Sequence, residues 1–236
     1  NGDVEKVWAN PAKAKKILKY PKRNRDVHTE PVPLLGGTAI IISFSISILL
    51  NYLINPNFYV TIEVIGLAVG IVIISFMGIL DDIYDLKPVI KAGFQFLAAI
   101  ATVLISGSKI AYFTNLGQNN NLVYLPEIIS FIATVLWIFM LTNAFNIIDG
   151  LDGLTTGTTI ICSLTLFFIT FVRPDANLVG EYIPILLIAL SGAAAGFLPF
   201  NFNPAKLYLG ETGAAFLGFT VAVISIQGTM KAHAAI

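Results

Sequence analysis

The sequence is short of charged residues and of cysteine, and each shortage excludes a class of protein. Only 12% of the 236 residues are Asp, Glu, Lys or Arg, about half of the roughly 25% that is typical of soluble domains. A water-soluble chain that is 56% hydrophobic would expose large apolar patches and aggregate. A single cysteine, Cys162, excludes an internal disulfide framework, and its apolar neighbours indicate a buried thiol. A lipid bilayer is therefore the expected solvent.

The first 27 residues lack an apolar segment, so they do not have the pattern of a secretory signal peptide. We interpret residues 1–27 as a basic cytoplasmic N-terminal arm and residues 28–236 as one transmembrane domain. The spacing of the apolar residues in the arm (Val4, Trp8, Ile17 and Leu18) is compatible with a short amphipathic helix on anionic headgroups. A solvated tail is the alternative.

Seven uncharged, apolar stretches have about the length that a helix needs to cross a bilayer. These stretches are Leu34–Ile54, Val64–Leu80, Ala92–Ser108, Ile128–Ile148, Leu154–Val172, Tyr182–Phe200 and Thr212–Met230. Barrel strands would alternate polar and apolar residues, which these stretches do not do. A helix satisfies its backbone hydrogen bonds within one segment, so the predicted fold class is all-α, a polytopic membrane protein of about seven spans.

The basic residues predict how the chain is oriented in the membrane. Lysines and arginines concentrate before the first stretch, and basic residues favour the cytoplasmic side. Counting spans from a cytoplasmic N-terminus then gathers six acids at the cytoplasmic face. These acids are Asp81, Asp82, Asp85, Asp149, Asp152 and Glu211. Acids that only hydrate loops are the alternative, but a clustering at helix ends favours a functional site.

The first candidate motif is GILDDIYDLKPVIK, which contains Asp81, Asp82, Asp85 and Lys91 and follows an apolar stretch. Adjacent carboxylates repel each other, so they favour a divalent cation or a shared proton. Lys91 could neutralise a phosphate that the cation brings in. A hydrated loop with a snorkelling lysine is the alternative.

The second candidate motif is NAFNIIDGLDGLTTG. Its residues Asn143, Asn146 and Asp149 repeat at a spacing of three, which places them on one helix face. Such side chains are costly in hydrocarbon, so they indicate a functional site. Gly150 and Gly153 are expected to end the helix and let the backbone approach a ligand. Helix caps are the alternative, although capping explains only one of these residues.

The third candidate motif is FLPFNFNPAKLYLGETG. Glu211 could supply a hard oxygen ligand there, and Tyr208 a flat face on which a base could stack. A glutamate that only favours a helix N-terminus is the alternative. The lone His28, in VHTEPVPLLGG, is given no chemical role.

Together and in this order, the four segments resemble the polyprenyl-phosphate N-acetylhexosamine-1-phosphate transferase family, of the glycosyltransferase family 4 type. That family includes phospho-MurNAc-pentapeptide transferase and the GlcNAc-1-phosphate transferases of teichoic acid, O-antigen and N-glycan assembly. The similarity covers Val27 to Gly228. The phrases DDIYDL and PFNFNPAK resemble the GlcNAc-1-phosphate branch more than the MurNAc-pentapeptide branch.

The resemblance implies a Mg²⁺-dependent reaction at the plasma membrane. UDP-GlcNAc would transfer GlcNAc-1-phosphate to undecaprenyl phosphate, giving undecaprenyl-diphospho-GlcNAc and UMP, as the first membrane step of cell-wall glycopolymer synthesis. The protein would be multi-pass, with its active site facing the cytoplasm. The implied partners are a polyprenyl phosphate, a UDP-N-acetylhexosamine and membrane lipids, with no nucleic acid; a homodimer is left open.

Matching the motifs position by position implies a role for nine residues. The catalytic and phosphate-binding residues would be Asp81, Asp82, Lys91 and Asp149; the nucleotide-binding residues Asn143, Asp152 and Tyr208; and the Mg²⁺ ligands Asn146 and Glu211. Of the nucleotide-binding residues, Asp152 matches a position that contacts uracil, and Tyr208 matches an aromatic residue that packs on it.

The chain departs from the family pattern in three respects. The family usually has Asp where Glu211 stands, and a small hydroxylated residue where Ala214 stands. It also has a histidine-rich loop of the type HxHHR and a span before the His28 region, neither of which is found in this sequence. We therefore expect a fragment of a fold with ten or eleven spans.

Three alternative functions stay open at the level of sequence. A membrane prenyltransferase could use DDIYD, although NAFNIIDGLDG does not give the second aspartate-rich pattern at the wider spacing of that chemistry. A cation-coupled transporter would place its carboxylates nearer the bilayer midplane. A catalytically impaired family member could bind only lipid or a partner.

Overall fold

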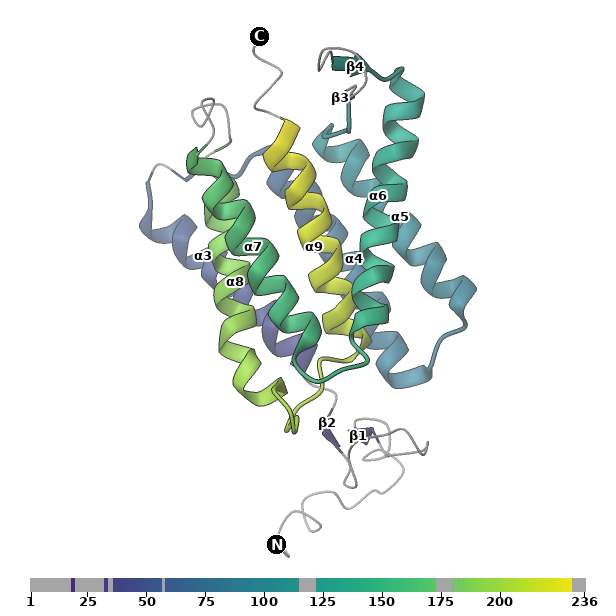
Figure 1. Ribbon diagram of the computed structural model, residues 1–236, viewed down its shortest axis with the longest axis vertical. Coiled ribbons are helices and arrows are strands. Elements are labelled where there is room, and N and C mark those ends of the chain that lie inside the picture. The colour runs from purple at the N-terminus through teal and green to yellow at the C-terminus, as the bar shows by residue number, and fades with distance from the viewer. Residues whose placement is uncertain are drawn as a thin grey trace, which may run out of the picture.

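The computed structural model is a bundle of seven long helices (Figure 1). It describes residues 18–19, 32–33, 36–56, 58–114, 122–172, 180 and 182–230. Within them the helices are α3 (Gly36–Ile54), α4 (Ile62–Tyr84), α5 (Pro88–Ser106), α6 (Glu127–Ile148), α7 (Leu154–Val172), α8 (Tyr182–Asn201) and α9 (Gly210–Met230). All seven are long and apolar enough to cross a membrane, so the predicted all-α, polytopic fold is confirmed.

Two short antiparallel strand pairs accompany the helices, and the sequence analysis predicted neither. Strand β1 (Leu18–Lys19) pairs with β2 (Val32–Pro33), and β3 (Tyr112–Thr114) pairs with β4 (Leu122–Tyr124) between α5 and α6. Apart from β1, the predicted basic arm lies outside the described residues, as does His28. Strands of two or three residues are too short to produce a recognisable alternation of polar and apolar side chains.

The connection between α4 and α5 is shorter than predicted. The predicted spans Val64–Leu80 and Ala92–Ser108 imply a loop over Asp81–Lys91, and this is wrong, because α4 continues to Tyr84 and α5 begins at Pro88. Asp85 takes a left-handed conformation with a φ of 55° that ends α4, and a proline in the first turn suits the start of α5. The three charged residues of interest here, Asp81, Asp82 and Lys91, therefore stand on helices rather than on a loop.

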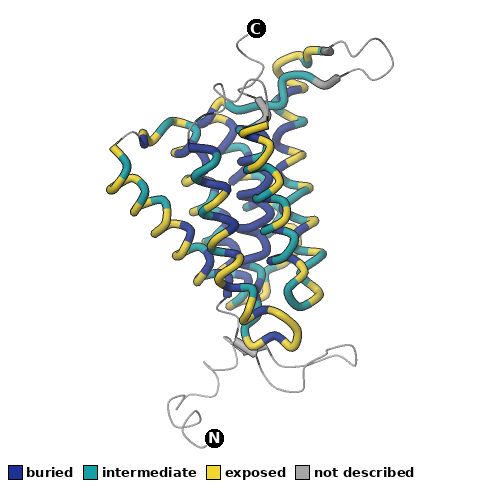
Figure 2. Tube along the Cα trace, turned by 60° about the vertical axis from the view of Figure 1, so that its left-hand side comes forward, coloured by how far each residue is buried: buried dark blue, intermediate teal, exposed yellow. Residues whose placement is uncertain are grey.

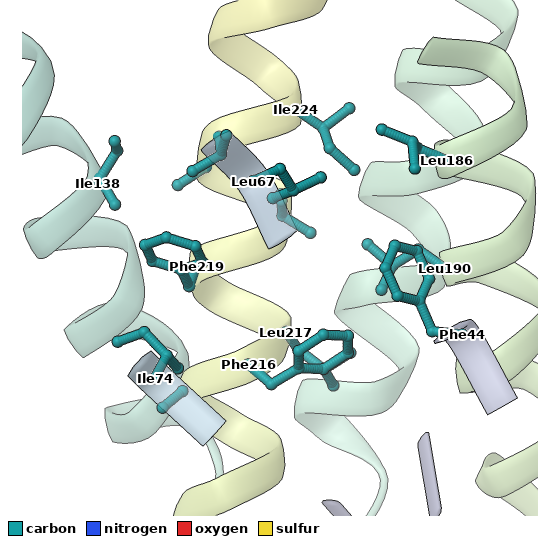
Figure 3. Close-up of a cluster of buried hydrophobic side chains, with 14 of the residues drawn as sticks. Phe44, Leu67, Ile74, Ile138, Leu186, Leu190, Phe216, Leu217, Phe219 and Ile224 are labelled. Carbon is teal, nitrogen blue, oxygen red and sulfur yellow. The ribbon is translucent and has the colours of Figure 1, made fainter. Parts of the chain in front are cut away.

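Helix α9 is the central helix of the bundle. Helices α3, α4, α6, α7 and α8 pack against it, and α5 packs on α4 and α6. Of its membrane-crossing window, 89% of the residues are buried, against 17% for α3 (Figure 2). Figure 3 shows Phe216, Phe219 and Ile224 of α9 among apolar side chains of the surrounding helices. The outer helices expose large apolar residues such as Leu53 and Val72, as expected for contact with lipid. Cys162, predicted to be buried, is half-buried in α7.

Two glycines allow α3 and α4 to approach the first turn of α9 closely. A Cβ atom on Gly37 of α3 would lie 2.2 Å from the backbone nitrogen of Gly213. A Cβ atom on Gly78 of α4 would lie 2.4 Å from the Cα atom of Thr212. These distances are far below a van der Waals contact, so only glycine fits at either position. The beginning of α9 is thus held at the centre of one end of the bundle.

Candidate active site at the first turn of α9

The predicted acids all lie at one end of the bundle, which we call the site end. It is formed by the last turns of α4, α6 and α8 and the first turns of α3, α5, α7 and α9, at the bottom of Figure 1. The six acids are on these turns or in the short connections between them: Asp81, Asp82, Asp85, Asp149, Asp152 and Glu211. At the opposite end, Lys109 forms an ion pair with Glu127, with 2.7 Å between Nζ and Oε1.

Lys91 lies between two carboxylates that come from different helices. Its Nζ is 2.8 Å from Oδ2 of Asp81 and 3.5 Å from Oε2 of Glu211. The Asp81 side chain is also fixed by its other oxygen, which accepts a hydrogen bond of 2.7 Å from the backbone N–H of Leu86. Asp81 is only 8% exposed, so Lys91 supplies the positive charge that such a buried carboxylate requires.

Glu211 and Asn146 together offer oxygen atoms of the kind that a hard cation prefers. The Asn146 side-chain Nδ2 donates a hydrogen bond of 2.7 Å to Oε1 of Glu211. The Oδ1 atom of the same amide is buried and has no hydrogen-bond partner. Buried polar atoms are rarely left without a partner, so this oxygen fits the role of a metal ligand.

The donor set suits magnesium better than a metal that needs several side-chain ligands. Among the described residues, no group of three His, Cys, Asp or Glu side chains is arranged to hold a metal ion. Magnesium usually keeps several waters and binds through one or two protein ligands together with substrate phosphates. The Asn146 amide and the Glu211 carboxylate meet that requirement.

Asp82 faces different groups from its neighbour Asp81. Its Oδ1 accepts a hydrogen bond of 2.9 Å from the backbone N–H of Glu211. Its Oδ2 accepts two more from Thr212, one of 3.2 Å from the backbone N–H and one of 2.6 Å from the hydroxyl. The two adjacent aspartates therefore do not form one paired site.

Asp152 anchors the loop between α8 and α9. Its Oδ2 accepts hydrogen bonds from Asn203 Nδ2, at 3.2 Å, and from the backbone N–H of Ala205, at 3.0 Å. Tyr208 of the same loop is half-buried, and its carbonyl accepts a hydrogen bond from the N–H of Gly36. The structure places the two residues that were matched to uracil contacts, Asp152 and Tyr208, at the site end, and their contact with uracil stays a prediction.

Asn143 contacts a different helix from Asn146, which belongs with Asp81, Lys91 and Glu211 to the group that we call the Lys91 cluster. Asn143 donates through Nδ2 to Oε1 of Gln95 on α5, at 2.7 Å, so it turns toward α5 while Asn146 turns toward α9. Asp149 directly follows the last residue of α6 and is half-buried. Asn143 and Asn146, predicted to share one face of the helix, therefore contact two different helices.

Three polar residues contribute to this end but were not predicted. Thr212 forms a hydrogen bond with Asp82, and Gln95 forms one with Asn143. Asn201 links the connection between α6 and α7 to the loop between α8 and α9. The Asn201 Oδ1 accepts from the Gly153 N–H and the Thr156 hydroxyl, while its Nδ2 donates to the Leu207 carbonyl. A polar residue inside an apolar stretch is a signal that could have identified Gln95.

Comparison with known proteins leads to the same family that the four motifs indicate. The family model described as "Glycosyl transferase family 4" matches residues 64–229. The chain belongs to this family. Its match includes α4 to α9 and therefore every residue of the Lys91 cluster.

Three relatives show how the family divides. A probable undecaprenyl-phosphate N-acetylglucosaminyl 1-phosphate transferase of Bacillus subtilis is 35% identical, over 88% of this chain and 54% of its own length. A decaprenyl-phosphate N-acetylglucosaminephosphotransferase of Mycolicibacterium smegmatis is 30% identical, over 87% and 52%. A phospho-N-acetylmuramoyl-pentapeptide-transferase of Staphylococcus haemolyticus is 32% identical, over 83% and 62%. The chain thus spans somewhat more than half the length of these relatives.

Proposed function

We propose that the protein transfers GlcNAc-1-phosphate from UDP-GlcNAc to undecaprenyl phosphate, releasing UMP, with Mg²⁺ as cofactor. The observation that carries the proposal is the position of Lys91 between Asp81 and Glu211, next to the unpartnered oxygen of Asn146. Relatives named for this transfer to undecaprenyl and decaprenyl phosphates support the choice of substrates.

The charges of the cluster suit a reaction between two anions. Asp81, Asp82 and Glu211 bring three carboxylates against the single ammonium of Lys91, so further positive charge is needed before phosphates can approach. Bound at Asn146 and Glu211, Mg²⁺ would supply that charge and stabilise the diphosphate as its bond breaks. Lys91 would bind a phosphate oxygen and exchange part of its contact with Asp81 for it.

The remaining site residues would orient the two substrates. Tyr208 belongs to the loop between α8 and α9, and Asp152, between α6 and α7, accepts a hydrogen bond from it. The uridine of the donor would bind at this loop. The exposed apolar faces of the helices would keep the lipid acceptor in the membrane, beside the site end. We propose that this end faces the cytoplasm, because water-soluble UDP-GlcNAc and a membrane-bound acceptor can meet there.

The test is Mg²⁺-dependent release of UMP by the purified chain in detergent, with UDP-GlcNAc and undecaprenyl phosphate. We expect release to require both the lipid phosphate and Mg²⁺. A folded chain that releases no UMP under these conditions would refute the proposal and favour a family member that only binds lipid or a partner.

The variant Glu211→Asp tests whether the glutamate belongs to the working site. Aspartate would withdraw the carboxylate by about 1.5 Å, one carbon–carbon bond, and the 2.7 Å contact with Asn146 would be lost. Because a displacement of about 1 Å can cost a factor of about 100, we expect activity to fall by roughly that factor. Higher activity in Glu211→Asp would show that glutamate impairs this chain.

A further inference from the structure

The first turn of α9 is capped by a residue from another helix. The first N–H groups of a helix have no partner inside the helix, and a side chain just before the helix usually accepts from them. Here the carboxylate of Asp82, 129 positions away in the sequence, accepts from the N–H groups of Glu211 and Thr212. It also accepts from the Thr212 hydroxyl at 2.6 Å.

The backbone around this cap is shaped to admit the carboxylate. Gly210 has a φ of 73°, and a Cβ atom there would lie 2.9 Å from Oδ2 of Asp82. Gly78, one helical turn before Asp82 on the same face of α4, lets the Thr212 backbone approach. Both positions where α4 crosses α9 therefore require glycine, so the backbone of the fold is shaped to hold the Asp82 carboxylate at this cap.

We propose that Asp82 is a positioning residue, which holds Glu211 in place and does not itself act on the lipid phosphate. Both of its oxygens already accept hydrogen bonds from α9. Of the two adjacent aspartates, only Asp81 contacts Lys91. The proposal deepens the proposed function, on which the metal-binding role of Glu211 rests.

The first experiment measures the cap without using activity. Amide hydrogen exchange of the segment 210–214 is followed by mass spectrometry in the wild type, Asp82→Ala, Thr212→Val and Thr212→Ser. We expect exchange about tenfold faster in Asp82→Ala, as for the loss of a helix cap, a smaller increase in Thr212→Val, and none in Thr212→Ser, which keeps the hydroxyl. Unchanged exchange in a folded Asp82→Ala protein would overturn the cap.

The second experiment separates positioning from direct action on substrate. It compares Asp82→Asn with Thr212→Val, which removes one hydrogen bond to Asp82 but leaves its carboxylate. If Asp82 positions Glu211, both variants bind Mn²⁺ alone more weakly by electron paramagnetic resonance. Both also lower kcat while the KM for undecaprenyl phosphate stays unchanged.

The result that overturns the proposal is equally specific. An inactive Asp82→Asn protein with wild-type Mn²⁺ affinity, beside a fully active Thr212→Val protein, would mean that Asp82 acts on substrate directly. Both variants are milder than Asp82→Ala, so the comparison still decides if the alanine variant fails to fold. A wild-type chain that releases no UMP refutes the proposed function, whereas the exchange and Mn²⁺ measurements still decide the role of Asp82.

Discussion

At the scale of single residues, one lysine forms ion pairs with two acids of the candidate site. Lys91 contacts Asp81 and Glu211, which belong to α4 and α9. Removing its charge would leave the buried Asp81 carboxylate without its cation and the two acids without a group between them. Such a change would disturb the architecture of the cluster and, under the proposed function, would weaken its binding of a phosphate.

The variant Lys91→Met is therefore expected to lower UMP release by about 100- to 1,000-fold, as does loss of one electrostatic group in other active sites. Lys91→Arg keeps the charge and should retain part of the activity. The matched control is Lys87→Met, because Lys87 is exposed just before α5 and forms no ion pair with the acids of the described residues. Equal activities for the two methionine variants would contradict the assignment of Lys91.

At the scale of elements, the seven spans could be predicted from the sequence because each is an uncharged apolar stretch. The ends of the helices could not, because Asp81 and Asp82 continue α4 although their charges suggest a loop. The gathering of the acids at one end followed from counting spans. The different partners of Asp81 and Asp82 could not be predicted from the sequence. Asp81 contacts Lys91 on α5 and Asp82 contacts Glu211 on α9, and these contacts are set by how the helices pack.

The separate directions of Asn143 and Asn146 illustrate the same limit. A spacing of three residues keeps side chains within one broad face of a helix, but two different helices can pack on that face. Here Asn143 donates a hydrogen bond to Gln95 on α5, and Asn146 donates one to Glu211 on α9. Periodicity predicted the common face, and only the three-dimensional packing separates the Asn143–Gln95 amide pair from the Asn146–Glu211 pair.

The crossing of α4 and α9 gives a prediction about stability. Gly78→Ala would place a Cβ atom 2.4 Å from the Cα atom of Thr212, so the helices must separate, at a cost of about 1–3 kcal/mol. The control is Gly93→Ala on α5, where a Cβ atom meets nothing within 4 Å. Replacing that helical glycine should be neutral or should stabilise by up to about 1 kcal/mol. Thermal unfolding in detergent measures the stability of both variants. Equal unfolding temperatures for Gly78→Ala and Gly93→Ala would contradict the close crossing of α4 and α9.

At the scale of the whole molecule, the two ends of the bundle have different chemistry. The site end holds the acids, Lys91 and the loop anchored by Asp152, whereas the opposite end holds the β3–β4 pair and the Lys109–Glu127 ion pair (Figure 1). An enzyme that joins a water-soluble nucleotide sugar to a membrane lipid needs both substrates at one surface. If the proposed function is right, the site end is therefore the end that faces cytoplasmic UDP-GlcNAc.

That orientation can be measured with single cysteines in a Cys162→Ser background. Leu151→Cys and Lys206→Cys report on the site end, and Tyr124→Cys and Glu127→Cys on the opposite end; all four positions are exposed. A membrane-impermeant maleimide should label only positions 124 and 127 in intact cells, and positions 151 and 206 only after permeabilisation. Labelling of 206 in intact cells would place the acids outside the cell, where no cytoplasmic nucleotide sugar can reach them, and would refute the proposed reaction.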